Sequence, residues 1–447
     1  MTNIFFLLAL LIFSMTASVS ALSFFEREVT AGKRLLLLSF LTPLPFLIVG
    51  FLNIPVLSVS ILIFLIILLT IVFFPSLKTA DQHIQPVTQI DERDIMFSRD
   101  KLTTNPQNYT QYYKDNPEKK ARDDNFRQNP GLLSRDTKFY ELFPFAAADA
   151  NFSITKHFHD ISGPAVNPTR QNVGPKSATH FIANWLRKNG AVDVGFGKLE
   201  KYHLYSHHGY AKKYGKVVDN NHKFAIAFLV EMDKEMMSTA PYAPVVMESS
   251  QQYLKAGILA VTVAKFISNL GYSARAHIDG KYDLIAPLVA RDCGLGEIGR
   301  MGILISNQMG PRVRIAVITT DMPVKLTQFK PDLSVEEFCR FCKKCATVCP
   351  SMAIPFEDKK PIHGIKRWQI DQEKCFHFWT KTGTDCGRCM QVCPYSHANN
   401  LFHKSVRFMI KHFPVFRRLA IYMDDLIYGR KPVSKKTFQW MENNIRD

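Results

Sequence analysis

Eight of the nine cysteines in this 447-residue chain lie within one stretch of 55 residues, and their spacing is the strongest constraint on the chain. The first four follow C-x2-C-x2-C-x3-C and precede a proline, and the second half of the set also ends in Cys-Pro. Three thiolates at this spacing reach three corners of one [4Fe–4S] cluster, while the fourth ligates the other cluster. Reciprocal pairing predicts cluster one on Cys339, Cys342, Cys345 and Cys393, and cluster two on Cys349, Cys375, Cys386 and Cys389.

Two other uses of clustered cysteines fit less well. A secreted disulfide scaffold spreads its cysteines through a short chain, and this chain is long. Zinc accepts C-x2-C pairs but does not require two runs that each close on Cys-Pro. Cys293, outside the cluster region, is most simply a small buried residue. The motif alone therefore predicts transfer of single electrons and leaves the acceptor open.

The first 75 residues are almost entirely apolar, and they predict a membrane anchor over residues 1–77. Residues 4–25 carry no charge and are long enough to cross a hydrocarbon core of about 30 Å as a helix. A second uncharged run is interrupted at Asn53-Ile54-Pro55, so we expect helices over about 35–51 and 56–74. A cleaved signal peptide is the alternative for residues 4–25, but no Lys or Arg precedes that apolar run.

Basic residues beside the spans predict the orientation of the anchor. Lys33 and Arg34 lie in the expected first loop, and Lys78 follows the last span. With three spans, this loop and the soluble region share one side, which the positive-inside rule makes the cytoplasm. No twin-arginine signal precedes the apolar run. We therefore expect a protein of the cell (inner) membrane whose soluble domain is cytoplasmic.

The soluble chain divides by its sequence pattern. Residues from about 81 to 130 are polar without a clear apolar period, which predicts an irregular arm packed on a folded core over residues 78–150. In residues 151–330, apolar strands alternate with helical stretches, which predicts an α/β or α+β core. We expect the strands at 223–232 and 313–321 and the helices at 177–189 and 248–270.

Two further regions follow the core. Residues 331–400 hold the cluster motif and predict a ferredoxin-type domain. Residues 401–447 form a basic tail. Its stretch 401–423 is compatible with an amphipathic helix on the core or on the membrane surface, and equally with a helix whose charged face is simply solvated. The net charge of +17 suits an anionic partner such as lipid headgroups, an acidic electron carrier or nucleic acid.

Several motifs upstream of the cysteines resemble those of the corrinoid-dependent reductive dehalogenases. They are GLGEIGR at 294–300, GILIS and GPRVR up to Arg314, TDMP at 320–323, LGY at 270–272, and DERD at 91–94 with Phe97 and Arg99. The likeness covers roughly residues 88–430, in the family's order. It implies an α+β fold, with a nitroreductase-like cobalamin-binding core and a ferredoxin-like twin [4Fe–4S] insert, preceded here by transmembrane helices.

The resemblance also implies the cofactors, substrate and partners. We expect two [4Fe–4S] clusters and a base-off cobalamin, and the chain lacks the D-x-H-x-x-G pattern that delivers a histidine to cobalt. The expected substrate is an organohalide, in particular a halogenated aromatic. No flavin- or nicotinamide-binding domain is visible, so an external donor (quinol, ferredoxin or flavodoxin) is implied. Membrane lipid is an expected partner and nucleic acid is not. The three-helix anchor resembles the small membrane partner of these enzymes, as if fused.

Catalytic residues are implied by position within the resemblance. Tyr253 matches the family's proton donor, and a cation beside it would lower its pKa and stabilise the tyrosinate. Arg314, or Arg312 beside it, resembles that cation. Asp279 stands where the family has an asparagine. The alternative for Tyr253 is an aromatic core residue on the helix 248–270.

Contacts with the corrinoid are implied less specifically. The three glycines of GLGEIGR let the backbone approach the corrin or its nucleotide tail, or they serve only a tight turn. Trp379 either lines the pocket or shields cluster two. The full set of implied cofactor contacts is Gly294, Gly296, Glu297, Gly299, Arg300, Asp279 and Trp379.

Two alternative functions stay open at this point. Epoxyqueuosine reductase resembles this chain in its clusters and cobalamin, but it typically has Trp and Lys where this chain has Glu297 and Arg300, and it lacks membrane helices. The other alternative is an iron–sulfur electron-transfer protein of the membrane with no substrate of its own. We expect an oxidoreductase, and specifically a membrane-anchored reductive dehalogenase.

Overall fold

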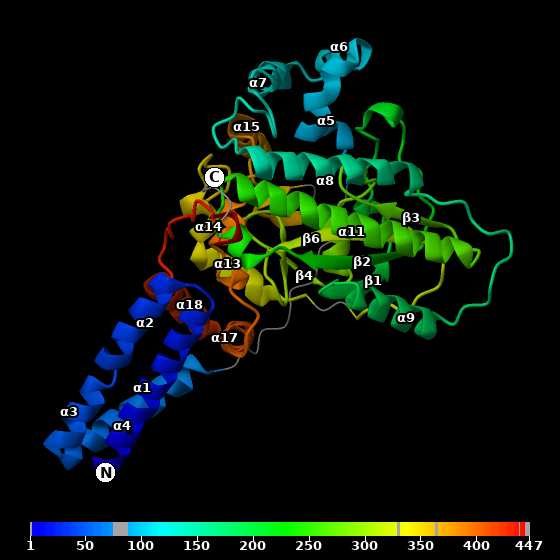
Figure 1. The fold of residues 1–447 in the computed structure, drawn as a ribbon. Helices are drawn as coiled ribbons and strands as arrows, with labels where there is room; N and C mark the ends of the chain where they lie inside the picture. Colours follow the sequence, from blue (N-terminus) through cyan, green and yellow to red (C-terminus); the bar gives the residue numbers. More distant parts are fainter. Residues whose placement is uncertain (1, 75–87, 329–330, 363–364, 438, 443–447) are drawn as a thin grey trace. The chain divides into compact units, whose positions relative to one another are not determined.

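The computed structural model describes residues 2–74, 88–328, 331–362, 365–437 and 439–442 (Figure 1). The chain forms two compact units. The anchor unit comprises Met1–Thr79, Glu337–Cys342 and His397–Pro432. The core unit comprises Ala80–Glu336, Lys343–Ser396 and Val433–Asp447.

The anchor unit begins with four apolar helices: α1 (Thr2–Phe25), α2 (Val29–Leu41), α3 (Leu44–Leu52) and α4 (Pro55–Val72). They supply three stretches long and apolar enough to cross a membrane: Asn3–Phe25, Val29–Leu52 and Pro55–Val72. The expected number of long apolar stretches is found, and the second begins at Val29 instead of about residue 35. Lys33 and Arg34 lie within the first turns of α2 rather than in a loop. Their long apolar stems allow helical positions near a span end while the charges reach water.

The tail contributes two further helices to the anchor unit, α17 (Leu401–His412) and α18 (Pro414–Ile427). The predicted amphipathic helix is therefore interrupted. Phe413, between the two helices, adopts an extended backbone conformation because the next residue is a proline. α18 packs against α2 and α4.

The core unit is built on a four-stranded antiparallel sheet in the order β1-β2-β6-β3. Its strands are β1 (Asp193–Lys198), β2 (Phe224–Glu231), β3 (Ala274–His277) and β6 (Val313–Thr320). The long helices α9 (Pro175–Lys188) and α11 (Ala243–Asn269) cover one face. The other face is covered by α12 (Ala286–Asp292) and the hairpin of β4 (Gly296–Ile298) and β5 (Leu304–Ser306). The two central strands have buried side chains on both faces, which explains their continuous apolar sequences.

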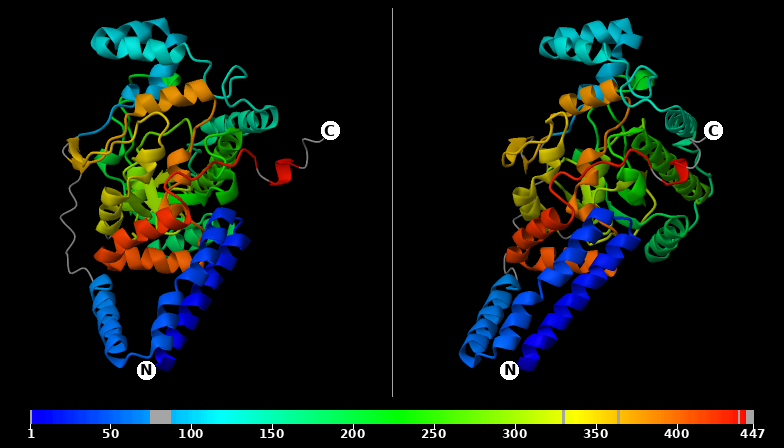
Figure 2. Two further views of the ribbon diagram at one scale, coloured as in Figure 1. Left: turned by 90° about the vertical axis from the view of Figure 1, so that its left-hand side faces the viewer. Right: turned by 60° about the vertical axis from the view of Figure 1, so that its left-hand side comes forward.

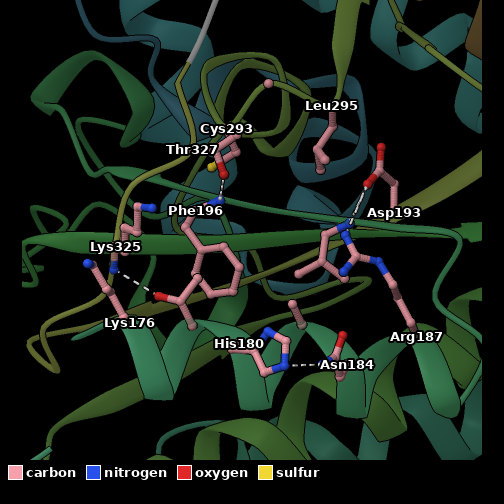
Figure 3. A pocket seen from close by; sticks show the side chains of 14 residues that line it. Lys176, His180, Asn184, Arg187, Asp193, Phe196, Cys293, Leu295, Lys325 and Thr327 are labelled. Atoms are coloured by element: carbon pink, nitrogen blue, oxygen red, sulfur yellow. Dashed lines mark hydrogen bonds and ion pairs between the residues drawn. The ribbon is translucent and has the colours of Figure 1, made fainter. Parts of the chain in front are cut away.

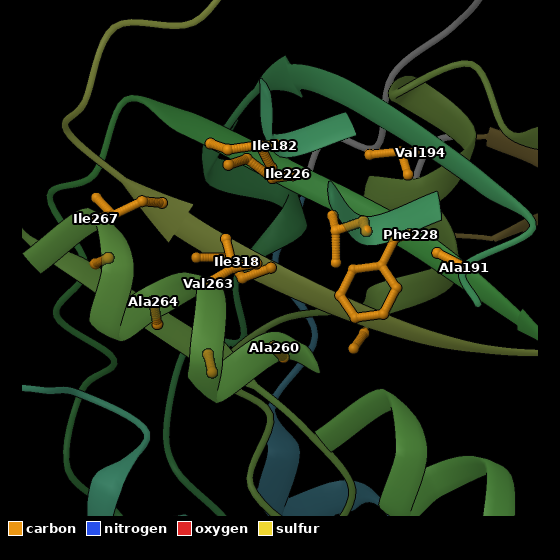
Figure 4. Packing of buried hydrophobic residues seen from close by; sticks show 14 of the residues in the cluster. Ile182, Ala191, Val194, Ile226, Phe228, Ala260, Val263, Ala264, Ile267 and Ile318 are labelled. Carbon is orange, nitrogen blue, oxygen red and sulfur yellow. The ribbon is translucent and has the colours of Figure 1, made fainter. Parts of the chain in front are cut away.

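Figure 4 shows the main core between the sheet and its two long helices. Phe228 and Ile318 of the sheet pack against Ile182 of α9 and against small residues of α11 such as Ala260 and Ala264. Alanines at these positions allow the long helix to approach the sheet closely. The predicted strands and both predicted core helices are confirmed, with bounds that differ by a few residues.

The expectation of an irregular arm over residues 78–150 is wrong for most of the described part. It forms α5 (Met96–Asp100), α6 (Pro106–Asp115), α7 (Pro117–Arg127) and the start of α8 (Leu142–Ile161). The first helices are held by a buried polar network instead of an apolar stripe. The Arg99 guanidinium lies 2.7 Å from the Asp123 carboxylate, which also accepts a 2.8 Å hydrogen bond from Tyr113. Hydrophobic periodicity does not detect helices that are packed in this way.

The remaining elements of the core unit are short and surround the cysteines. They are α10 (Lys234–Met237), α14 (Lys344–Val348), α15 (Gln372–Thr382), α16 (Arg388–Gln391), α19 (Gln439–Glu442), β7 (Lys360–Ile362) and β8 (Ile365–Arg367). A further helix, α13 (Leu333–Cys342), carries the first two cysteines of the motif.

Candidate active site

The four thiols predicted for cluster two come together in the core unit. Burial, together with neighbouring thiols of the same set, raises the pKa of Cys375 and of Cys386 to about 12. Burial and the other thiols also raise the pKa of Cys389. Several thiolates so close together in an apolar setting require a compensating positive charge, which an iron–sulfur cluster supplies. This set of donors fits a [4Fe–4S] cluster.

In the portion of the chain that the structure describes, no three His, Cys, Asp or Glu side chains converge in the manner of a single-ion site.

The thiols predicted for cluster one divide between the two units. Cys339 and Cys342 belong to the anchor unit, and Cys345 and Cys393 to the core unit. Within the anchor unit, Arg430 donates a 2.6 Å hydrogen bond to the carbonyl oxygen of Cys342. Cluster one as a whole stays a prediction from the motif.

Tyr253 lies beside a cation, as the sequence predicted. The side chain of Arg314, from β6, is stacked on the ring of Tyr253 from α11, with 4.4 Å between the guanidinium carbon and the ring centre. Burial raises the pKa of the Tyr253 hydroxyl to about 12, and Arg314 acts in the opposite direction. Tyr253 therefore holds its proton at neutral pH, next to a group that would stabilise its anion.

Asp385 completes this site and was not found from the sequence. Its carboxylate lies 2.8 Å from the Arg314 guanidinium and accepts a hydrogen bond from the Ser249 hydroxyl. Among the residues that the structure describes, two buried polar atoms, the Arg314 Nε and the Asp385 Oδ1, have no hydrogen-bond partner. Asp385 directly precedes Cys386, a predicted ligand of cluster two. The polar site and the cluster cysteines are thus joined by one peptide bond, and a polar ligand has two atoms to bind there.

Asp279 faces the same group of charges. It follows β3, and burial raises the pKa of its carboxyl to about 6, while Arg314 and Lys101 oppose this shift. Its backbone carbonyl lies 2.7 Å from the Nε2 of His159. The protonated carboxyl can donate a hydrogen bond, as the amide of an asparagine would.

Arg312 is buried and hydrogen-bonds to backbone carbonyls instead of contacting Tyr253. Its guanidinium donates hydrogen bonds of 2.7 Å to the carbonyl of Ser396 and 2.5 Å to that of Met232. Of the two arginines proposed as the partner of Tyr253, Arg314 is the one that the structure brings to it.

The charged residues of GLGEIGR hold neighbouring segments together. Glu297 accepts a 2.9 Å hydrogen bond from the backbone of Asp332. Arg300 donates 2.8 Å hydrogen bonds to the carbonyls of Pro355 and Glu357 in the ferredoxin-type region. These contacts fix the turn against the segment that holds the cysteines.

The glycines of this motif differ in their surroundings. A Cβ atom on Gly296 would lie 2.1 Å from the carbonyl oxygen of Ile305, so the pairing of β4 with β5 explains that glycine. Gly299 donates to Ile303 in a tight turn, at 3.0 Å. Gly294 instead lines a surface hollow of about 580 Å³ beside α9 and β1 (Figure 3). Tyr253 and Arg314 are not among the residues that line this hollow.

Trp379 lies close to a cluster-two thiol. It packs against Phe376 and Phe97, with ring centres 6.5 and 6.0 Å away. Burial raises the pKa of the Cys375 thiol, and the Trp379 indole acts in the opposite direction. This surrounding supports the interpretation of Trp379 as a shield for cluster two.

The DERD segment anchors the helical arm to the core. Glu92 accepts a 2.6 Å hydrogen bond from the backbone of Gly209, and burial raises the pKa of its carboxyl to about 7. Asp91 pairs with Arg93 at 2.7 Å, and Asp94 pairs with Lys119 at 2.7 Å.

Comparison with known proteins gives one consistent group of relatives. The family described as "4Fe-4S dicluster domain" matches residues 338–397. The tetrachloroethene reductive dehalogenase of Sulfurospirillum multivorans is 35% identical over 225 residues, which cover 48% of this chain and 44% of that protein. The corresponding enzyme of Desulfitobacterium hafniense is 30% identical over 259 residues, which cover 55% and 46%. The chain spans about half the length of the curated relatives it matches.

A solved structure extends the likeness to the fold. The reductive dehalogenase whose structure suggests a mechanism for B12-dependent dehalogenation aligns with a TM-score of 0.60 and 26% identity, covering 69% of this chain and 46% of that one. Epoxyqueuosine reductase of Bacillus anthracis is a more distant relative, 27% identical over 121 residues, which cover 24% of this chain and 28% of that protein. The chain is therefore similar to the reductive dehalogenases in sequence and in the fold of its mixed α/β core, and its residues 338–397 match the 4Fe–4S dicluster family.

Proposed function

We propose that this chain is a membrane-anchored reductive dehalogenase, an oxidoreductase that works with two [4Fe–4S] clusters and cobalamin. The observation that carries the proposal is the contact of Tyr253 with Arg314. Arg314 in turn forms an ion pair with Asp385, the residue directly before Cys386, a proposed ligand of cluster two. Such a site brings a proton donor, the Tyr253 hydroxyl, close to the proposed cluster that would deliver the electrons. The homologues and the 4Fe–4S dicluster domain support it.

The reaction replaces a carbon–halogen bond with a carbon–hydrogen bond. It consumes two electrons and one proton and releases a halide ion. In our proposal, the Tyr253 hydroxyl provides the proton and Arg314 stabilises the tyrosinate that is left. Asp385 keeps the Arg314 guanidinium in place through its 2.8 Å ion pair. Water then returns a proton to the tyrosinate.

Cobalamin, when bound, supplies the metal centre at which the carbon–halogen bond breaks. Support comes from the solved relative that is described as B12-dependent. Further support comes from the two polar atoms of Arg314 and Asp385 near Tyr253 that have no partner within the described part of the chain. From the family resemblance alone we propose the remaining cofactor contacts: Gly294, Gly296, Glu297, Gly299, Arg300 and Asp279 with the corrinoid, and Trp379 with cluster two.

We propose a halogenated aromatic as the organohalide. Phe152 lies near Tyr253, with 6.4 Å between their ring centres, and offers an aromatic surface beside the proposed proton donor. The curated relatives named above act on tetrachloroethene by name, so a haloalkene is the competing substrate.

The electron donor is external: a quinol, a ferredoxin or a flavodoxin. Two proposed ligands of cluster one, Cys339 and Cys342, belong to the unit that contains the apolar helices, which favours a quinol dissolved in the membrane. We place the soluble domain in the cytoplasm, on the positive-inside argument. Fusions of a reporter to residue 432 would test this: green fluorescent protein would fluoresce, and alkaline phosphatase would be inactive.

The decisive experiment is turnover by the reconstituted full chain. Protein with cobalamin and clusters, reduced by a viologen dye, is given bromophenols, tetrachloroethene and an epoxyqueuosine-containing tRNA stem-loop. We expect halide release from a bromophenol. Turnover of the stem-loop alone would instead identify an epoxyqueuosine reductase. Reconstituted protein that binds no cobalamin would refute the enzyme proposal and leave an electron-transfer protein.

A further inference from the structure

α18 carries apolar side chains on two sides of the helix, of which one is buried and the other is exposed. Its inner side is buried through Phe416, Ala420, Ile421 and Ile427. Its outer side exposes an unbroken apolar stripe: Val415, Leu419, Tyr422, Met423 and Leu426. At about 100° per residue, these positions span an arc of about 100° on the helix surface. A continuous exposed stripe of this kind marks a surface that contacts another apolar medium.

The position of α18 in the anchor unit shows which medium this is. α1 ends at Phe25, α2 begins at Val29 and α4 ends at Val72. If the three stretches span a bilayer in turn, these three ends lie at the same membrane surface. α18 is attached at that level, as Figures 1 and 2 show for the end of the helix bundle.

Specific contacts fix α18 to those span ends. Arg34 of α2 donates a 3.1 Å hydrogen bond to the carbonyl of Leu426. Ile427 is buried with Ala31 of α2. Phe73, next to the end of α4, packs against Phe416 with ring centres 6.3 Å apart. The outer stripe therefore lies at the depth where lipid headgroups meet acyl chains.

α17 adds apolar and positive side chains at the same level. Leu401 is 84% exposed and Phe408 is 58% exposed on one side of this helix. Lys404 and Lys411 are exposed on the flank of that side, as Arg418 is on α18. Aliphatic or aromatic residues bordered by Lys and Arg are typical of helices that lie in an anionic interface.

We propose that α17 and α18 form an interfacial platform, with the apolar stripe of α18 inserted into the lipid headgroup region and Lys404 and Lys411 bound to anionic headgroups. This rests on the membrane-anchor part of the proposed function and not on the reaction. A soluble protein partner is the competing occupant. The continuity of the stripe with the span ends favours the bilayer, because lipid already surrounds those ends.

Photo-crosslinking of the full chain in proteoliposomes tests this platform. The photoreactive residue benzoylphenylalanine replaces Tyr422, which is 73% exposed on the stripe. Matched positions are Phe51, 77% exposed on the apolar helix α3, and Phe143, 73% exposed on α8 of the core unit. Mass spectrometry then identifies the adducts. We expect lipid adducts at Tyr422 and Phe51 and none at Phe143.

The outcomes separate the platform from the anchor. Lipid adducts at Phe51 with protein adducts or no adducts at Tyr422 would overturn the platform and leave the anchor intact. Absence of lipid adducts at both Phe51 and Tyr422 would overturn the platform together with the anchor.

The choice of lipid tests the two lysines. In vesicles of mixed phosphatidylcholine and phosphatidylglycerol, we expect adducts at Tyr422 to be enriched in phosphatidylglycerol. A basic residue near a membrane surface contributes roughly fivefold in affinity, so Lys404→Gln with Lys411→Gln should abolish most of the enrichment. The charge-matched control is Lys198→Gln with Lys360→Gln in the core unit, where we expect no change. Equal enrichment in both double variants would refute headgroup binding by Lys404 and Lys411.

Discussion

Replacement of Arg314 by methionine removes the cation that is stacked on the Tyr253 ring at 4.4 Å. With an effective dielectric constant of about 20, a charge about 5 Å from a tyrosinate is worth roughly 3 kcal/mol. The Asp385 carboxylate, 2.8 Å from Arg314, offsets part of that effect. Since about 1.4 kcal/mol corresponds to a factor of ten, we expect kcat to fall by roughly tenfold to hundredfold.

The assay is halide release by reconstituted protein, divided by its iron and cobalamin content so that unfolded protein does not count. Tyr253→Phe should lower kcat by roughly 10²-fold or more, the range for loss of a general acid. If Arg314 acts through the tyrosinate, the double variant should be no slower than Tyr253→Phe alone. If the loss of kcat in the double variant equalled the product of the losses in the two single variants, the reasoning would be refuted.

Arg312→Met is the matched control for loss of a buried arginine. Its side chain binds the carbonyls of Ser396 and Met232, so we expect lower stability but normal turnover per intact protein. A loss of turnover in Arg312→Met as large as in Arg314→Met would show that Arg314 has no special role.

Three further predictions concern stability and the clusters. The pKa of Asp279 is about 6 in place of 3.8, so the folded state binds more protons than the unfolded state between these two pH values. The free energy of unfolding should therefore fall by at most about 3 kcal/mol as pH rises from about 4 to about 6. Urea denaturation should show this dependence on pH, and Asp279→Asn should remove it. Gly296→Ala forces a Cβ against the Ile305 carbonyl and should lower the urea midpoint clearly, whereas Gly163→Ala, with open space around it, should not. Cys386→Ala should remove about four irons per chain, while Cys293→Ala, outside the motif, should remove none.

The parts of the fold that the sequence predicted are those with a regular apolar pattern. The two central strands are apolar throughout because both of their faces are buried, and α11 and the three spans are long apolar helices. The helices in residues 96–127 differ from the predicted irregular arm because they depend on the buried pairing of Arg99 with Asp123, which leaves no apolar period.

The site was predictable only where a motif or a fixed spacing identified a residue. The cysteines follow such a spacing, and the proposed pair of Tyr253 and Arg314 rests on the family resemblance. Asp385 and Ser249 have no local signal. Asp385 is 71 residues from Arg314 and 136 from Ser249 along the chain, and only the folded chain brings these polar groups together.

Asp279 shows how one residue changes the charge at this site. Arg314 and Asp385 form an ion pair, so their charges largely cancel. The charge of Asp279 then determines the net charge near Tyr253, and burial raises the pKa of its carboxyl to about 6. When Asp279 is ionised, it disfavours a negative charge on Tyr253, and the phenol keeps its proton more firmly. When Asp279 is protonated, this repulsion is absent, and its hydroxyl can donate a hydrogen bond as the asparagine of the family pattern would. Under the proposed mechanism, an aspartate at this position therefore preserves the role of that asparagine only while it carries a proton, and the proposed proton donation by Tyr253 becomes easier on the acid side of pH 6.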